Sequence, residues 1–299
     1  MNQVQWLQER RKGLGGSDIA AILGISPWRT PYQVYQDKRS ELAPIPQNDA
    51  MEWGTRMEPT IRQWYSDTTG RLVRLPEGII YHDKYPFMLA SLDGVTDDRR
   101  VVEIKTASNG QKWGEPGTDE IPDYYMTQVQ HYLIVTGFEV CDLPVSIAGS
   151  LPVLYEIHAD RELHEMMIDA EAEFWQRVVD GNPPDVQTYS DAVQRFGHSD
   201  AKGIIEIGAG NVEDIQHLKE IKARITDLEA EEEKLKAEFI KLLGENGDVL
   251  AFQGENLITY KLSKGRETFD VSAFQKVHPD LYANFKKVGE PSRLFLLKI

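Results

Sequence analysis

The chain has 299 residues, of which 41% are hydrophobic and 27% charged, the range of a soluble globular protein of about two domains. Its polar start and lack of a long apolar run lead us to expect neither signal peptide nor membrane span, and its one cysteine, Cys141, excludes a disulfide framework or multi-thiolate zinc site and favours a reducing compartment. The net charge of −15 argues against a protein that coats nucleic acid by bulk attraction, but it leaves room for a local basic site.

The chain is predicted to begin with short helices separated by loops. Residues 3–12 have the pattern of a short helix, and a glycine-rich loop then leads into a helix over 19–23. Ser17 or Asp18 is expected to cap this second helix, because either side chain can accept a backbone N–H that the first turn leaves unpaired. Pro31 is expected to open a third helix, since proline has no N–H to lose at that position.

A loop and a longer helix are expected next. Residues 41–48 contain two prolines and predict the loop. From Met51 onward, apolar residues recur at three- and four-residue spacing, which indicates one buried stripe on a helix. Pro59 is expected to kink this helix or to begin its second half. The stripe consists of Trp53, Met57, Ile61, Trp64 and Tyr65.

Short apolar runs between turns then predict strands, with further helices among them. The expected strands are 72–75, 78–82, 87–95, 101–106, 140–147 and 153–159. The expected helices are 121–136 and 161–180, each followed by a glycine that ends it.

Residues 182–203 indicate a boundary. They divide the chain into a predicted core, 1–203, and a C-terminal accessory region, 204–299. Charge is also uneven, because basic residues outnumber acidic ones in 1–40 and in 257–299 while the acidic excess lies between. Both ends can therefore face a polyanion that the rest of the surface repels.

The accessory region is predicted to contain a long charged helix over 212–243 and a strand pair within 249–269 that turns near 253–256. The apolar stripe of the helix is near-heptad but lapses around residues 230–233. We therefore expect a helical hairpin arm or a bundle helix rather than an extended coiled coil.

Segment 87–106 carries the most informative pattern. If its two predicted strands pair as an antiparallel hairpin around a turn centred on Asp98, Asp93 lies directly opposite Glu103. Two like charges in that position are destabilising unless something neutralises them, and a divalent cation is the natural candidate. Because side chains alternate along a strand, Lys105 shares the face of Glu103, while the residues between and before them turn into a core.

This pattern admits two interpretations. Hard oxygen ligands without a neighbouring His or Cys suit Mg²⁺ or Mn²⁺ rather than zinc, and the seven histidines show no ligand spacing. The alternative is a solvated hairpin with an ordinary Asp-Gly turn and an alternating Glu/Lys edge. The spacing Asp, nine residues, Glu, one residue, Lys does not decide between them.

Three other segments change this balance: WGTRMEP at 53–59, RRKGLGGSDIAAILGISPW at 10–28 and YYMTQVQHYLIVTG at 124–137. With them, residues 4–180 resemble the lambda-exonuclease-like, YqaJ-type viral recombinase family, a phage branch of the PD-(D/E)xK nuclease superfamily. The resemblance implies an α/β (α+β) fold with a central mixed sheet flanked by helices, and 5′ to 3′ digestion of one strand of duplex DNA from an end. Leu92 stands where the superfamily's name has a proline, a position without a chemical role.

The resemblance also implies a catalytic set. Asp93, Glu103 and Lys105 match the catalytic acid, acid and lysine, and Glu58 matches a carboxylate on an upstream helix near the metals. Phosphodiester cleavage needs an activated water and charge stabilisation, which two metal ions supply together. We expect two Mg²⁺ ions, with Mn²⁺ as a substitute: Asp93 bridges them, Glu103 and the Ile104 carbonyl complete one, and Glu58 the other. Lys105 is expected to orient or deprotonate the attacking water, or to neutralise the transition state.

A second implied set holds the DNA end. Arg10 and Ser17 match the pair that in this family holds the 5′-terminal phosphate, and Tyr125 and Gln128 match a helix face beside the site. Backbone N–H groups of Gly15, Gly16 and Ser17 at a helix start are expected to form an anion site, to which Arg10 adds a charge-assisted bond. The alternative is that Ser17 is only a helix cap and Arg10 only a surface charge.

The function expected from these residues is a Mg²⁺-dependent 5′ to 3′ exonuclease on linear double-stranded DNA, whose 3′ tails pass to a phage single-strand annealing protein. A structure- or site-specific endonuclease is one alternative, and a non-catalytic DNA-end-binding module is the other. We further expect a phage- or prophage-encoded protein in the bacterial cytoplasm. A homo-oligomeric ring, trimer or tetramer, would let an acidic chain keep hold of DNA. Three roles stay open for the accessory region: subunit packing, guidance of DNA and docking of the annealing protein.

Overall fold

The computed structural model describes residues 3–41, 48–200, 202–289 and 291–298. The chain divides into two compact units, which meet between Arg195 and Phe196, inside the 182–203 segment. Residues 42–47, most of the predicted loop 41–48, lie outside the described residues.

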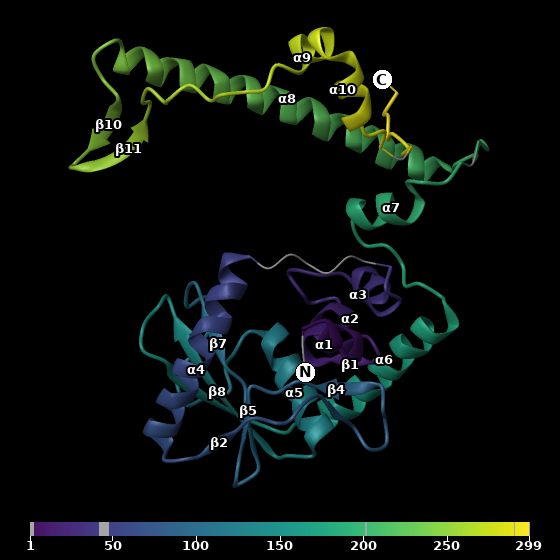
Figure 1. Cartoon of the computed structure of the whole chain (residues 1–299), viewed down its shortest axis with the longest axis vertical. Helices are drawn as coiled ribbons and strands as arrows, with labels where there is room; N and C mark the ends of the chain where they lie inside the picture. Colours follow the sequence, from purple (N-terminus) through teal and green to yellow (C-terminus); the bar gives the residue numbers. More distant parts are fainter. Residues whose placement is uncertain (1–2, 42–47, 201, 290, 299) are drawn as a thin grey trace. The chain divides into compact units, whose positions relative to one another are not determined.

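The first unit is built on two sheets (Figure 1). The larger has the order β2-β5-β6-β8-β7, with β9 paired to β8, and the smaller has the order β1-β4-β3. Strands β6 and β7 run parallel to β8, and β1 runs parallel to β4, while the other pairs of these two sheets are antiparallel. The strands are β1 Leu14–Gly15, β2 Val73–Arg74, β3 Ile80–Tyr81, β4 Met88–Ala90, β5 Gly94–Thr96, β6 Arg100–Val102, β7 Lys105–Ala107, β8 Val140–Ile147 and β9 Val153–His158. The expected mixed sheet with flanking helices is confirmed.

Two predicted strands are each divided. The predicted strand 87–95 is wrong as one element: β4 pairs in the small sheet, residues 91–93 leave the ladder, and β5 joins the large sheet. The predicted strand 101–106 becomes β6 and β7, which both pair with β8 in a single register on either side of the break at 103–104. The chain therefore passes from the small sheet to the large sheet immediately before Asp93. The alternation of apolar and polar residues in this segment does not indicate that change.

Helices surround these sheets. Those of the first unit are α1 Gln3–Arg10, α2 Gly16–Ile22, α3 Pro31–Lys38, α4 Asp49–Thr69, α5 Asp123–Thr136, α6 Arg161–Asp180 and α7 Tyr189–Phe196. Pro31 opens α3 as expected, with Thr30 as its cap. Glycines in the left-handed conformation end α5 and α6, as predicted. Helix α7 lies in the segment for which the sequence predicted only a boundary.

Two expectations about helix details are wrong, the cap of α2 and the place of Trp53. The cap of α2 is Gly15, because the carboxylate of Asp18 in the third helical position accepts the Gly15 N–H at 3.0 Å, and Ser17 lies inside the first turn. Pro59 lies inside α4, which continues through it as one element, so of the two expected outcomes the second start does not occur and the kink stays a prediction. Trp53 is 54% exposed and so does not belong to the buried stripe, which reaches only the C-terminal part of α4.

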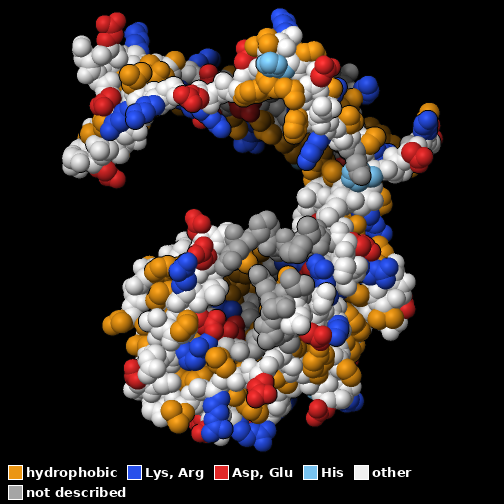
Figure 2. All heavy atoms as spheres, viewed as in Figure 1, with side chains coloured by type: hydrophobic (Ala, Val, Ile, Leu, Met, Phe, Trp, Pro, Cys, Tyr) orange, Lys and Arg blue, Asp and Glu red, His pale blue; other side chains and the backbone are white. Residues whose placement is uncertain are grey.

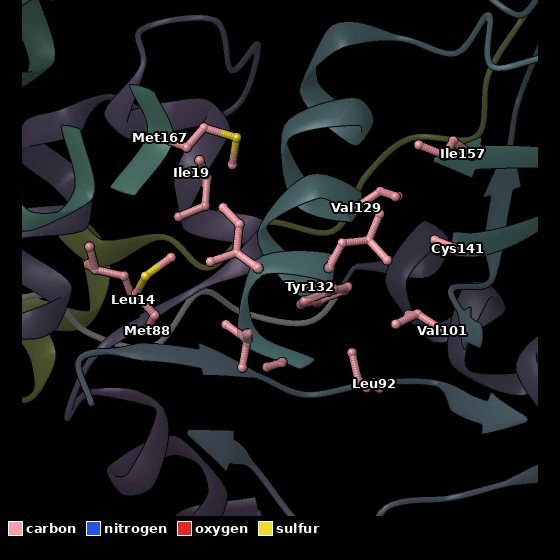
Figure 3. Packing of buried hydrophobic residues seen from close by; sticks show 14 of the residues in the cluster. Leu14, Ile19, Met88, Leu92, Val101, Val129, Tyr132, Cys141, Ile157 and Met167 are labelled. Carbon is pink, nitrogen blue, oxygen red and sulfur yellow. The ribbon is translucent and has the colours of Figure 1, made fainter. Parts of the chain in front are cut away.

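The core lies on both faces of the large sheet. Val101 and Cys141 belong to the larger cluster, in which Val129 and Tyr132 of α5 also pack (Figure 3). Val102 and Ile104 belong to a second cluster with Ile61 and Tyr65 of α4. Because neighbouring residues of a strand point to opposite faces, α5 covers one face of the sheet and α4 the other. The expectation that Val102 and Ile104 turn into a core is confirmed.

A buried histidine joins α5 to β4 and α6. One ring nitrogen of His131 lies 2.8 Å from the Leu89 carbonyl and the other lies 3.0 Å from Glu171 Oε1. Both partners accept hydrogen bonds, so the pair holds an extra proton that both nitrogens of an imidazolium can donate. Burial lowers the pKa of His131, but the Glu171 carboxylate outweighs burial and holds that pKa above its ordinary value of 6.5.

This pair predicts a pH-dependent contribution to stability. The folded state binds more protons than the unfolded chain, so the contribution is complete below about pH 6.5 and is lost as pH rises through the raised pKa of His131. His131→Gln is expected to lower the free energy of unfolding by about 2 kcal/mol at pH 6 and by less at pH 9. Thermal unfolding across that range measures the gap. Exposed His158→Gln is the control, and a gap that widens with pH would contradict the assignment.

The second unit contains a long helix, a hairpin and two short helices: α8 Ala209–Leu243, β10 Val249–Phe252, β11 Glu255–Thr259, α9 Val271–Val277 and α10 Pro279–Phe285 (Figure 1). The long helix and the hairpin turn near Gln253 are confirmed, although the second strand ends at Thr259 instead of continuing to 269. Nothing in the sequence pattern predicted α9 and α10. Within the described ranges, every helix is too short or too polar to cross a membrane.

Candidate active site

One pocket of the first unit, about 440 Å³ in volume, is lined by every residue for which the sequence predicted a role. Figure 2 shows a hollow in this unit with acidic and basic side chains close together at its edge. The ten predicted residues in its wall are Arg10, Gly16, Ser17, Glu58, Asp93, Glu103, Ile104, Lys105, Tyr125 and Gln128. Segments that are far apart in the sequence thus contribute to one concave surface.

The pairing of β5 with β6 brings Asp93 and Glu103 together. Gly94 pairs with Val102, so Asp93 immediately precedes one strand and Glu103 immediately follows its partner. Gly94 is required here, because a Cβ at this position would lie 2.2 Å from Cγ1 of Val73. Asp93 Oδ2 accepts the backbone N–H of Ile104 at 2.8 Å, which holds the carboxylate beside the break in the second strand. The predicted opposition of the two acids is confirmed in position.

Glu103 is the most deeply buried of the polar groups at the pocket's acidic end. It is 2% exposed, and its Oε1 accepts hydrogen bonds from Lys105 Nζ at 2.6 Å and Gln128 Nε2 at 2.8 Å. Its buried Oε2 has no hydrogen-bond partner among the described residues. Burial and the negative charge of Asp93 raise the pKa of Glu103 to about 8. This carboxylate therefore lies where a positive ligand would relieve a large electrostatic cost.

Lys105 lies between acid and aromatic groups. Its Nζ is 5.1 Å from the centre of the Tyr125 ring as well as within hydrogen-bond distance of Glu103. Burial lowers the pKa of Lys105, but the carboxylates of Glu103 and Asp93 outweigh burial and hold that pKa above its ordinary value. The ammonium form is thus the one that faces the pocket. Gln128 also donates to the Tyr132 hydroxyl at 3.0 Å, so α5 orients the whole group.

Glu58 reaches the pocket from α4. Its carboxylate forms an ion pair with Arg62 one turn later, and Arg62 Nε donates to the backbone carbonyl of Asp93 at 3.0 Å. Burial and the nearby Asp93 carboxylate raise the pKa of Glu58. Arg62, which no sequence motif singled out, therefore connects the helix to the acidic end of the pocket.

These oxygen donors have the chemistry of a hard divalent cation site. The buried, unpartnered Oε2 of Glu103 beside Asp93 is the observation that fits a cation. In the described part of the chain no three His, Cys, Asp or Glu side chains form an assembled metal cluster. Among these carboxylates, Lys105 contacts Glu103, and Arg62 contacts Glu58.

The other end of the pocket is basic. Arg10, at the end of α1, donates a hydrogen bond to the Ser17 hydroxyl and stacks its guanidinium on the Trp6 ring at 5.2 Å. Gly16 is required at this point, because a Cβ there would lie 2.6 Å from Cε1 of Tyr132. The first backbone N–H groups of a helix have no partner within it, so α2 begins with donors beside Arg10.

A buried carboxylate, that of Asp18, organises this basic end. From the sequence, Asp18 was expected to do no more than cap a helix. Asp18 is fully buried and lies 2.7 Å from Lys38 Nζ, 3.1 Å from Arg29 and 3.6 Å from Arg10. Burial raises the pKa of Asp18, but these three cations outweigh burial and hold the pKa well below its usual range. The signal available in the sequence was an excess of basic residues in segment 1–40, without any indication of which acid they surround.

A family model and two related proteins match this chain. The YqaJ-like viral recombinase domain matches residues 5–139. The uncharacterized protein YqaJ of Bacillus subtilis is 34% identical over 247 residues, which cover 79% of this chain and 76% of that protein. The uncharacterized protein R354 of Acanthamoeba polyphaga mimivirus is 27% identical over 152 residues, which cover 46% of this chain and 27% of that protein.

Solved structures show the same fold. An alkaline exonuclease, LHK-Exo from Laribacter hongkongensis, matches with a TM-score of 0.50 and 23% identity over 60% of this chain and 94% of that chain. The structure of LHK-Exo in complex with dAMP matches over the same shares with a TM-score of 0.51 and 23% identity.

Proposed function

Because the chain belongs to the YqaJ-like viral recombinase family, we propose that it is a Mg²⁺-dependent 5′ to 3′ exonuclease on linear double-stranded DNA. Its product would be a duplex with 3′ single-stranded tails, the substrate for strand annealing in phage recombination. The observation that carries the proposal is the convergence of an Asp/Glu/Lys group and an Arg/Ser group in one pocket. An acidic end suits metal-assisted hydrolysis, and a basic end suits a terminal phosphate.

At the acidic end, Asp93, Glu103, Glu58 and the Ile104 carbonyl would hold two Mg²⁺ ions, or Mn²⁺ in their place. The bound ions would supply an activated water and stabilise charge on the phosphoryl and leaving oxygens. Gln128 and Lys105 hold Glu103 in place through its Oε1 and leave Oε2 available to a ligand. Arg62 holds the backbone of Asp93.

Lys105 would act on the substrate as an ammonium group. Its Nζ is fixed between Glu103 and the Tyr125 ring, so it enters the site at a defined position with little loss of side-chain entropy on binding. A fixed cation there orients an attacking water and neutralises negative charge that develops on the scissile phosphate. Of the roles expected from the sequence, orientation and charge neutralisation agree best with a protonated Lys105.

At the basic end, Arg10, Ser17 and the backbone N–H of Gly16 would bind the 5′-terminal phosphate. Asp18 helps to fix Arg10, whose guanidinium already lies on the Ser17 hydroxyl. The exonuclease of similar fold has been solved with dAMP, a deoxynucleoside monophosphate, which supports nucleotide binding by this architecture. A phosphate held at one end of the pocket and ions at the other would restrict cleavage to the first nucleotides of a DNA end.

The proposal is tested by digestion of linear duplex DNA with Mg²⁺, using 5′-phosphorylated, 5′-hydroxyl and covalently closed circular substrates. We expect loss of the 5′ strand from linear DNA, no cutting of closed circles, and no digestion by Lys105→Ala. Exposed Lys84→Ala is the matched control and should digest normally. Cutting of closed circles would assign a structure- or site-specific endonuclease instead, and binding of ends without metal-dependent cleavage would assign a non-catalytic end-binding module.

Arg10→Ala is expected to remove the preference for phosphorylated ends. The ratio of initial rates on 5′-phosphorylated and 5′-hydroxyl DNA should fall by about 10- to 100-fold, because one charge-assisted hydrogen bond to the phosphate is lost. Neighbouring Lys12→Ala, which is exposed and paired with Glu9, should keep the wild-type ratio. An unchanged ratio in Arg10→Ala would show that the phosphate binds elsewhere.

The proposed setting follows from the same activity. We infer that the protein is phage- or prophage-encoded, acts in the bacterial cytoplasm and passes its 3′ tails to a single-strand annealing protein. A ring of three or four copies with basic surfaces turned inward would keep an acidic chain on its DNA. Sedimentation of the active protein tests the ring, and a monomer that digests long DNA processively would refute it.

A further inference from the structure

The long helix of the second unit has an apolar face that the described residues leave open. Helix α8 runs for 35 residues, and Leu243 is its only buried residue. Figure 2 shows hydrophobic side chains gathered over α8 and α9 on the visible face. Ile225, Leu228 and Leu235 are 49%, 54% and 48% exposed, although burying a leucine or isoleucine side chain is worth about 1.5–3 kcal/mol. A helix with this much exposed apolar surface lacks a packing partner.

The apolar side chains of α8 follow a heptad that continues through residues 230–233. Positions a are Leu218, Ile225, Glu232 and Phe239, and positions d are Ile221, Leu228, Leu235 and Leu242. Seven of these eight positions are apolar over about three and a half heptads, the length at which a coiled-coil seam becomes significant. The apparent lapse at 230–233 reduces to one polar residue, Glu232, at an a position.

We propose that α8 pairs with α8 of a second copy of this chain as a parallel, in-register coiled coil. The charges beside the seam are the reason for choosing a second copy. In a parallel pair, a g residue of one helix faces the e residue five positions later on the other. Arg224 then faces the partner's Glu229, and Glu231 faces the partner's Lys236, and the two-fold symmetry repeats both attractive pairs.

The same charges oppose an antiparallel arrangement. With the seams fully overlapped, Lys222 would face the partner's Lys236 and Glu229 would face the partner's Glu229. Arg224, Glu229 and Glu231 are exposed, and no ion pair within the described part of this chain engages them. These three are therefore available to a partner helix, whereas Lys236 would exchange its ion pair with Glu232 of its own helix for one with the partner's Glu231. In the parallel pair Glu232, at an a position, lies against the partner's Glu232, which lowers stability, and the four attractive g–e pairs set the register.

The chain's own C-terminal segment lies at the flank of this seam. Leu297 and Ile225 line a shallow groove of about 670 Å³ whose other residues, including Lys219 and Ala223, belong mostly to the b, c and f positions of the helix. The d residues Ile221, Leu228 and Leu235 do not line that groove and are 40–54% exposed. A partner helix can therefore reach the seam beside the C-terminal segment.

Cysteine cross-linking of the full chain tests the parallel arrangement. In a parallel in-register pair, a cysteine at the d position 242 lies against its copy, whereas in an antiparallel pair it does not. The one native cysteine, Cys141, is buried and does not compete. We expect Leu242→Cys to form a disulfide-linked dimer in oxidised glutathione, and Lys241→Cys, one residue away at an outward position, to form little. Equal yields from the two variants would overturn the proposal.

Charge reversal tests the partner. Adding Arg224→Glu or Glu229→Arg to Leu242→Cys reverses both symmetry-related pairs and should slow dimer formation about tenfold. A mixture of the two reversed variants, or both changes in one chain, should restore the rate. The matched controls are Lys234→Glu and Glu233→Arg, which make the same kinds of charge change away from the seam.

Unchanged rates in the reversed variants, or reversed variants that stay slow when mixed, would overturn the pairing of α8 with itself. The cross-linking rate does not depend on nuclease activity. Failure of this proposal is therefore distinguishable from failure of the proposed exonuclease.

Discussion

Glu103→Gln is expected to reduce digestion of 5′-phosphorylated linear DNA by roughly 10³-fold or more while the protein stays folded. The substitution keeps an oxygen that accepts the hydrogen bonds of Lys105 and Gln128, and it removes the negative charge of a buried carboxylate beside Asp93. A neutral amide cannot replace that carboxylate as a cation ligand of comparable strength. The measurement is the initial rate of nucleotide release at saturating Mg²⁺.

Stability should move in the opposite direction from activity. Without metal, burial and Asp93 hold the pKa of Glu103 at about 8, so the ionised form is costly in the folded protein. The melting temperature of metal-free Glu103→Gln should therefore equal or exceed that of the wild type. Glu173→Gln on α6, where the side chain is 71% exposed, is the matched control for rate and melting temperature. A Glu103→Gln variant that digests DNA at the wild-type rate would refute the assigned site.

Asp18→Asn is expected to lower the free energy of unfolding by about 3 kcal/mol, because the change leaves the fully buried Lys38 ammonium without its counter-charge. The effect should be complete at neutral pH, since the pKa of Asp18 is held below its usual range and its contribution persists until pH falls beneath about 3.8. Denaturant unfolding at pH 7 measures the loss. The variant should also bind DNA ends less selectively, because Asp18 helps to fix Arg10.

Two further variants test whether the loss of stability in Asp18→Asn comes from the unpaired buried charge of Lys38. Asp18→Asn combined with Lys38→Met should recover most of the lost stability, because both members of the buried pair are then neutral. Asp37→Asn is the matched control: its carboxylate lies 3.2 Å from Arg11 but is 23% exposed, and the expected loss is about 1 kcal/mol or less. A large loss in Asp37→Asn, or none in Asp18→Asn, would show that Asp18 does not organise this end of the pocket.

Local patterns in the sequence predicted most of the elements. The spacing of apolar residues and the glycines that follow them placed α5 and α6, and Pro31 placed the start of α3. These signals are local, because a helix needs only its own stripe and its own ends. Helix α7 and the two short helices near the C-terminus, of seven or eight residues each, were missed.

The sequence by itself determined the chemical groups of the pocket and the opposition of Asp93 and Glu103, because hairpin pairing converts sequence spacing into proximity. Only the tertiary structure decided three further points: the change of sheet before Asp93, the buried Asp18 that gathers Lys38, Arg29 and Arg10, and the hydrogen bonds that Glu103 accepts from Lys105 and Gln128. The physical reason is that burial and long-range charge contacts depend on which surfaces the packed helices cover, and no local pattern records that.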